Sequence, residues 1–221
     1  MRKTICVVGL GQFGSELAKE LAKKCDVLAL DLNEERVNAI VDHVQRAVIV
    51  DSRDFASLSA LVHAGFDEAI VSLGESIEAS ILCTLHLKKI GVKRIRAKAV
   101  TEDHAAILKA VGASDTIFPE RETARRVAGQ IVNPNLLDFV PLAEDYEVIQ
   151  AKSPVEFHGR SLLDLGLRER YKAMVLAVAH PQQEKVVFLP GPDYVIKLND
   201  VLILVGRIRD LERLEAETAN D

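Results

Sequence analysis

The chain has 221 residues, of which 48% are hydrophobic and 28% are charged, and its formal net charge is -5 at pH 7. This length suits one large domain or two modest ones, and the composition is that of an ordinary globular protein. The acidic balance argues against nucleic-acid binding, which requires a basic surface to meet phosphates. The three cysteines stand in apolar segments without C-x-x-C spacing, so neither a disulfide framework nor a zinc site is expected.

The N-terminus runs directly into a short strand-like segment and lacks the apolar region and cleavage site of a signal peptide. No uncharged apolar run approaches the ~20 residues that a membrane-spanning helix needs. We therefore expect a cytoplasmic protein that reaches the inner face of the membrane only through a partner.

The first 133 residues alternate between apolar, strand-like runs and segments of helical periodicity. The predicted strands lie at residues 4–9, 27–31, 47–51, 69–73, 94–99 and 116–118. The predicted helices lie at residues 13–24, 33–41, 55–63, 76–89, 103–111 and 120–132. This alternation predicts an α/β fold with a doubly wound, Rossmann-like parallel sheet, covered by helices on both faces.

The pattern changes at the turn cluster Asn-Pro-Asn, residues 133–135. Shorter predicted strands follow at residues 146–151, 173–180, 185–189 and 201–205, with a hairpin turn at 181–183 and a charged helix at 208–218. This second region predicts a small α+β domain. We place the first domain at residues 1–134 and the second at residues 135–221.

The strongest motif is a G-x-G-x-x-G sequence between the first strand and the first helix. Gly9 is expected to make the tight turn, Gly11 to let the backbone approach a phosphate, and Gly14 to let the helix pack on the strand. The N-terminus of the helix would then present unpaired N–H groups to the phosphates.

Acidic residues follow the next two strands. Asp31 lies where a carboxylate accepts hydrogen bonds from ribose hydroxyls, and Asp51-Ser52 would sit beside the base or the ribose. Together with the glycine motif they predict a bound adenine nucleotide, although a Rossmann fold that has lost its ligand is the alternative. A carboxylate at Asp31 would repel the 2′-phosphate of NADP.

Residues suited to catalysis are not gathered into any motif. The six histidines are scattered, and Gly-x-Ser-x-Gly, His-Glu-x-x-His and phosphate-loop lysine motifs are all missing from the sequence. We therefore expect binding without turnover. The alternatives are an NAD-dependent oxidoreductase with a small cap domain and a transcriptional sensor of the NADH/NAD⁺ ratio. The acidic charge and the lack of a recognisable DNA-binding helix pair weigh against the sensor.

The whole chain resembles the RCK (KTN) family, whose members carry TrkA-N and TrkA-C domains, and above all the soluble regulatory subunits of Ktr- and Trk-type potassium uptake systems. The segments that carry this resemblance are VVGLGQFG (7–14), LALDLNEERV (28–37), AIVSLG (69–74), IRAKA (95–99), VGASD (111–115), PER (119–121), GRSLLDL (159–165) and DVLILVG (200–206).

The resemblance implies a regulatory subunit that forms homodimers and then a ring, often an octamer, on the cytoplasmic face of an integral-membrane potassium-translocating subunit. ATP or ADP, or NAD(H) in some relatives, would bind the glycine cleft and change the shape of the ring. By position, Asp31 would hold the ribose, Asp51 would lie near the adenosine, and Lys98 would approach the phosphates. The other residues placed in the cleft by this resemblance are Gln12, Phe13, Leu73 and Gly74.

Glu120 matches a family position that binds a divalent cation where two ATP sites face each other. The alternative for Glu120 is a first-turn glutamate that complements the helix dipole, and for Lys98 a solvated lysine at a strand end. Relatives of the Ktr type usually carry arginine where this chain has Gln12. Because glutamine brings no charge, discrimination of ATP from ADP by that route is in doubt, and ADP, AMP or NAD(H) become stronger candidates.

The second domain resembles those that bind cyclic di-AMP at a dimer interface. Leu162, Leu163 and Arg168 match that pocket, while Gly166 replaces a polar residue often found there. The alternative, which we favour from sequence, is that the two leucines form a dimer core and Arg168 is a surface charge. A domain this small is expected to dimerise in either case, because its isolated sheet needs partner area.

Overall fold

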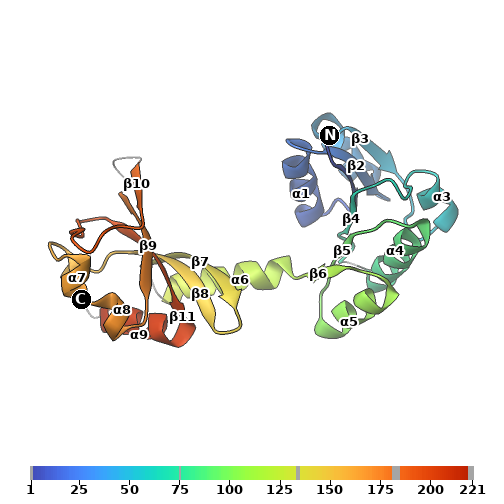
Figure 1. The fold of residues 1–221 in the computed structure, drawn as a ribbon. Coiled ribbons are helices and arrows are strands. Elements are labelled where there is room, and N and C mark those ends of the chain that lie inside the picture. Colours follow the sequence, from blue (N-terminus) through green and yellow to red (C-terminus); the bar gives the residue numbers. More distant parts are fainter. Residues whose placement is uncertain (1, 75, 133–134, 181–184, 219–221) are drawn as a thin grey trace. The chain divides into compact units, whose positions relative to one another are not determined.

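The computed structural model describes residues 2–74, 76–132, 135–180 and 185–218 (Figure 1). Contacts between Cα atoms divide the chain into two compact units, Met1–Glu120 and Arg121–Asp221. The division falls near the start of helix α6 (Pro119–Val132), so this helix goes with the second unit rather than closing the first. The boundary expected after residue 134 lies at residues outside the described part and stays a prediction.

The first unit is built on a parallel sheet of six strands. The strands follow the order β3-β2-β1-β4-β5-β6, and every neighbouring pair is parallel. Their bounds are β1 Thr4–Val8, β2 Asp26–Asp31, β3 Arg46–Ile49, β4 Glu68–Val71, β5 Ile95–Lys98 and β6 Asp115–Ile117. The chain starts in the middle of the sheet and winds outward in both directions, which is the predicted Rossmann-like arrangement.

Helices connect the strands, and local sequence signals begin most of them. The bounds are α1 Gln12–Ala22, α2 Glu34–Ile40, a 3₁₀ turn at Val41–His43, α3 Phe55–Ser59, α4 Ile77–Ile90 and α5 Glu102–Val111. Asn33, Asp54, Ser76 and Thr101 each cap a helix by accepting a hydrogen bond from a first-turn N–H. Helix α3 ends at Ser59, earlier than the predicted 63. Val62 is buried like Leu58. The four-residue spacing of these two apolar residues therefore reflects burial, although Val62 lies beyond the end of the helix.

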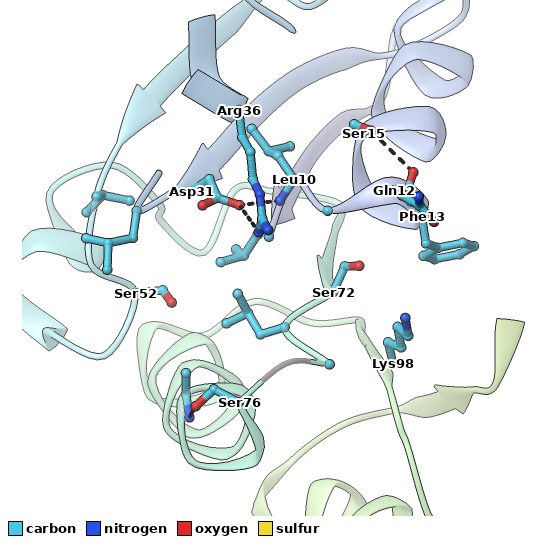
Figure 2. A pocket seen from close by; sticks show the side chains of 18 of the residues that line it. Leu10, Gln12, Phe13, Ser15, Asp31, Arg36, Ser52, Ser72, Ser76 and Lys98 are labelled. Carbon is cyan, nitrogen blue, oxygen red and sulfur yellow. Dashed lines mark hydrogen bonds and ion pairs between the residues drawn. The ribbon is translucent and has the colours of Figure 1, made fainter. Parts of the chain in front are cut away.

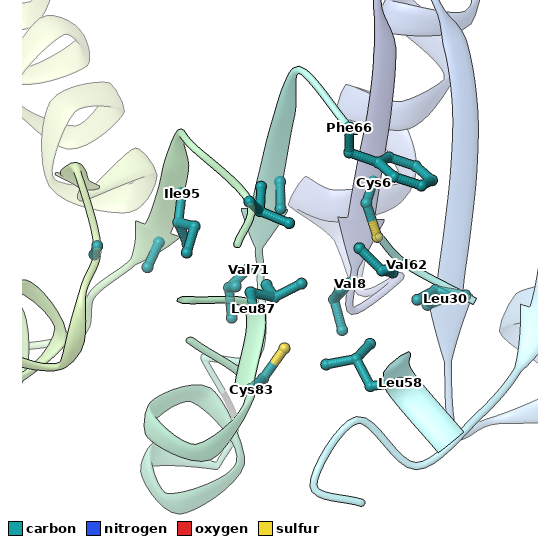
Figure 3. Close-up of a cluster of buried hydrophobic side chains, with 14 of the residues drawn as sticks. Cys6, Val8, Leu30, Leu58, Val62, Phe66, Val71, Cys83, Leu87 and Ile95 are labelled. Carbon is teal, nitrogen blue, oxygen red and sulfur yellow. The ribbon is translucent and has the colours of Figure 1, made fainter. Parts of the chain in front are cut away.

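Apolar side chains cover both faces of this sheet. In β1, Cys6 and Val8 belong to the core under α3, α4 and α5, whereas Ile5 and Val7 belong to the core under α1 and α2. Figure 3 shows the first of these cores, where Val8 meets Leu58. A strand buried on both faces explains why the sequence of β1 is almost continuously apolar rather than alternating.

Two of the three cysteines are sealed in this core, and their reactivity is expected to be correspondingly low. Burial raises the pKa of Cys83 to about 12 and raises the pKa of Cys6 well above its usual value. Because the thiolate is the reactive form, we expect a thiol reagent at pH 8 to label only the half-buried Cys25 in the native protein and all three cysteines in denaturant. Mass spectrometry of the labelled protein checks this. Labelling of Cys83 at the rate of Cys25 would contradict it.

The second unit is an antiparallel sheet with the strand order β10-β9-β11-β8-β7. Its elements are β7 Leu136–Ala143, β8 Tyr146–Lys152, a 3₁₀ turn at Val155–Phe157, α7 Leu162–Leu165, α8 Leu167–Arg170, β9 Met174–His180, β10 Lys185–Phe188, β11 Val201–Arg207 and α9 Ile208–Thr218. The strands predicted here and the last helix are present. Strand β7 was missed because it holds Pro141, which an edge strand tolerates. The hairpin turn expected at 181–183 lies outside the described residues.

The antiparallel sheet has a hydrophobic core of its own. Its core includes Ile149, Leu165, Leu202 and Leu211, which come from the strands, from α7 and from α9.

Among the described residues, no helix is long and apolar enough to cross a bilayer.

Candidate nucleotide-binding site

A crevice of about 970 Å³ lies at the carboxyl ends of the parallel strands of the first unit (Figure 2). Residues that follow β1, β2, β3, β4 and β5 all line it. Strands β2 and β4 flank β1 and continue the sheet in opposite directions from it. In open α/β sheets this point, where the strand order reverses, is where ligands bind, and the volume falls in the range of small-molecule sites.

Two glycines of the motif are required by the protein itself. Gly9 has φ +93°, and a Cβ there would lie 2.6 Å from the Ser72 carbonyl oxygen. A Cβ on Gly14 would lie 1.9 Å from the Gly9 carbonyl oxygen. The turn predicted at Gly9 and the close packing predicted at Gly14 are therefore confirmed.

Gly11 is different, because nothing in the described part of the chain requires glycine there. Its backbone angles, φ -64° and ψ -174°, are open to any residue, and a Cβ would meet no atom within 4 Å. Gly11 lines the crevice and is the N-cap of α1, so the space that a Cβ would fill lies beside the N–H groups of the helix's first turn. This cradle fits the phosphate of a nucleotide.

Asp31, at the end of β2, is buried and already holds the glycine turn in place. One carboxylate oxygen, Oδ2, accepts a hydrogen bond from the Leu10 N–H at 2.5 Å and lies 3.9 Å from Nη1 of Arg36. The other oxygen, Oδ1, accepts from the Asn33 N–H at 2.8 Å. A carboxylate has about four acceptor positions, so Asp31 keeps capacity for a ribose hydroxyl while it orders the turn.

The loop after β3 brings Asp51 and Ser52 to the crevice. Asp51 is partnered by Arg53, whose Nη2 lies 2.7 Å from its Oδ2, and this neighbour lowers the pKa of Asp51. Ser52 is buried beside the core residue Cys83, and its hydroxyl offsets part of the rise in the pKa of that thiol.

At the other side, Lys98 ends β5 and pairs with Glu120 in the first turn of α6. The lysine ammonium lowers the pKa of Glu120. A Cβ on Gly74 would lie 3.2 Å from Lys98 Cε, so the lack of a side chain at Gly74 leaves room for the Lys98 side chain. Within the described residues, no three histidine, cysteine, aspartate or glutamate side chains gather to hold a metal. Glu120 alone is no cation site within one chain, and its role toward a metal stays a prediction.

The residues that sequence reasoning placed in the cleft line this crevice, including Gln12, Phe13, Leu73 and Gly74. The exception is Gly14, which does not line it and instead packs against the backbone of the glycine turn. Figure 2 shows Gln12, Phe13 and Lys98 at one end and Asp31 and Arg36 at the other. The prediction omitted Arg36 and Arg53. Each of them follows a predicted acidic residue closely in sequence, and that spacing was the available signal.

The charges of the crevice are balanced within the chain. Arg36, Arg53 and Lys98 face Asp31, Asp51 and Glu120 in the pairs described above. An anionic ligand therefore meets cations that already have carboxylate neighbours, and its phosphates must compete for them.

The residues predicted to hold a second ligand lie around α7 and α8 in the second unit. Leu162 packs against the core, whereas 69% of the Leu163 surface is exposed and Arg168 is exposed. Gly166 joins the two helices with φ +57°, a conformation that favours glycine. Leu162, Leu163 and Arg168 thus lie on the two short consecutive helices α7 and α8. That they bind a ligand stays a prediction.

A Rossmann-like unit with a glycine cradle and a following small antiparallel unit define a two-domain protein with a ligand crevice in its first unit. The sequence matches the TrkA-N domain over residues 5–119 and the TrkA-C domain over residues 146–219. The chain therefore belongs to the TrkA-N/TrkA-C (RCK) family, whose members similar to it are potassium uptake proteins and not enzymes.

Two relatives from Bacillus subtilis (strain 168) match almost end to end. Ktr system potassium uptake protein C is 37% identical over 97% of both chains, and Ktr system potassium uptake protein A is 32% identical over 97% of this chain and 96% of its own. The GsuK channel shares the fold, with a TM-score of 0.69 and 17% identity over 99% of this chain and 40% of its own. The structure of the GsuK channel bound to NAD gives a TM-score of 0.65 and 16% identity, and it covers 97% of this chain and 39% of its own. This chain thus spans less than half of the GsuK chain.

Proposed function

We propose that this protein is a cytoplasmic regulatory subunit that binds an adenine nucleotide in the crevice and thereby controls a potassium-translocating membrane subunit. The observation that carries the proposal is the open space at Gly11, a glycine for which the described residues give no packing reason and which a bound phosphate would require. The near full-length similarity to two Ktr potassium uptake proteins supports the potassium partner.

The ligand would lie across the carboxyl ends of β1 and β2. Its phosphate would sit at Gly11 on the N-terminus of α1, where the unpaired N–H groups and the helix dipole attract an anion. Its ribose would be held by Asp31 and its adenosine would lie toward Asp51 and Ser52. ATP and ADP are our first candidates, with AMP and NAD(H) next.

Control of the partner requires two arrangements of the assembly that bind the nucleotide differently, since a ligand with equal affinity for both shifts nothing. We infer a homodimer that assembles further into a ring, an octamer by resemblance, docked on the inner face of the membrane. Exposed apolar side chains on the second unit, Leu163, Phe188 and Leu189 among them, support its self-association. We expect Leu162 and Leu163 to belong to that interface with Arg168 as a surface charge, and a cyclic di-AMP bound by these three residues is the alternative.

Nucleotide binding is expected to raise the melting temperature of the protein, because a ligand that binds only the native state stabilises it by mass action. At a nucleotide concentration 100 times the dissociation constant, the stabilisation is about 2.7 kcal/mol. Thermal-shift titrations with ATP, ADP, AMP, NAD⁺ and NADH would rank the ligands, with GTP as the matched control for the base. A flat response to all five adenine nucleotides would contradict the proposal.

A further inference from the structure

The Lys98–Glu120 ion pair stands out in the crevice because its two members differ in exposure. Only 16% of the Lys98 side chain is exposed, against 70% of the Glu120 side chain. In the described part of the chain, Glu120 is the one carboxylate paired with Lys98. A half-buried ammonium depends strongly on its counterion, whereas an exposed carboxylate loses little when it returns to water.

The pair also lies where a ligand would compete with it. Lys98, Glu120, Gly74 and the Gly11 cradle all line the same crevice. Figure 2 shows Lys98 near Gln12 and Phe13, at the end away from Asp31. A ligand anchored by its ribose at Asp31 and by one phosphate at Gly11 therefore directs any further phosphate toward Lys98.

We propose that Glu120 acts as an internal competitor for Lys98, so that the crevice measures how many phosphates its ligand carries. Without a ligand, Glu120 holds the ammonium. A second phosphate pairs with the Lys98 ammonium and displaces the Glu120 carboxylate into solvent. Adenosine, or a single phosphate at Gly11, leaves the Lys98–Glu120 ion pair intact. This regulation of the site rests on the proposed nucleotide binding.

Glu120 is also the last residue of the first unit, and α6 continues from it into the second. When Lys98 pairs with a phosphate instead of Glu120, the first turn of α6 loses its ion pair with β5. Ligands with one and with two phosphates would differ at this point even if their adenosine contacts were the same.

The test is calorimetric titration of the full chain with adenosine, AMP and ADP, in EDTA so that no divalent cation occupies the carboxylate. The Glu120→Gln substitution keeps the shape but removes the competing charge. It is expected to tighten ADP binding roughly three- to tenfold, the scale of one ordinary hydrogen bond, and to leave adenosine binding unchanged. Glu122→Gln is the matched control, because Glu122 is exposed on the same helix and does not line the crevice.

The Lys98→Met variant completes a double-mutant cycle. It is expected to weaken ADP binding about tenfold and to remove the gain from Glu120→Gln, since the two residues act through one contact. Unchanged or weaker ADP binding by Glu120→Gln, or a gain that survives in the double variant, would overturn the competition. If the unsubstituted protein bound no nucleotide at all, the proposed function itself would fail.

Discussion

The Gly11→Asp variant is expected to lose nucleotide binding by at least about 100-fold while it stays as stable as the original protein. The stability expectation follows from the backbone, because the φ and ψ of Gly11 suit any residue and a Cβ meets no atom within 4 Å. Aspartate is also a good N-cap, and Gly11 is the N-cap of α1. The binding loss follows from charge, since two like charges 4 Å apart at a protein surface repel by about 4 kcal/mol.

Two further variants separate the reasons for the loss. Gly11→Asn has the same size and capping ability without the charge, so it isolates the steric part of the effect. Gly14→Ala is the structural contrast, because its Cβ would fall 1.9 Å from the Gly9 carbonyl oxygen and must displace the turn. We expect Gly14→Ala to lower the melting temperature in the absence of ligand, and neither Gly11 variant to do so.

The measurements are a ligand-free thermal melt and a calorimetric titration with ADP for each variant. Normal ADP binding by Gly11→Asp would show that phosphates do not lie at this helix terminus. A large fall in the ligand-free melting temperature of Gly11→Asn would show instead that the protein itself needs glycine there.

The first unit could be predicted from sequence almost element by element, because each strand is a short apolar run and capping residues mark the helix starts. The glycine motif also predicted its own geometry, since Gly9 and Gly14 are needed for the turn whether or not a ligand is bound. What periodicity could not reveal is how side chains from distant segments pair. Lys98 and Glu120 come from different elements, and only the fold brings them together.

The second unit was predicted less completely for physical reasons. Strand β7 contains Pro141 and follows a turn cluster, and both features argue against a strand unless it lies at the sheet edge. Helices α7 and α8 have four residues each, too few to show a helical period. Such elements are held by tertiary contacts, as Leu165 and Leu167 in the core show.

The Asp200→Ala variant is expected to destabilise the second unit by roughly 3 kcal/mol, the scale for removing a buried charged acceptor from its partners. The Asp200 side chain is fully buried, and the residue immediately precedes β11. Its Oδ1 lies 2.9 Å from Nδ1 of His180, and its Oδ2 accepts from the Tyr194 hydroxyl at 3.1 Å and from the Lys197 N–H at 2.9 Å. Alanine would leave all three groups without this acceptor.

The chain offers a specific probe for this test. It has no tryptophan, and its three tyrosines, Tyr146, Tyr171 and Tyr194, all belong to the second unit, so tyrosine fluorescence in a urea titration reports on that unit alone. Asp200→Asn should lose less than Asp200→Ala, because an amide oxygen still accepts one hydrogen bond. Asp193→Ala, at an exposed position in the preceding loop, should change stability by less than about 0.5 kcal/mol. Equal urea midpoints for Asp200→Ala and Asp193→Ala would mean that the buried carboxylate does not stabilise the sheet.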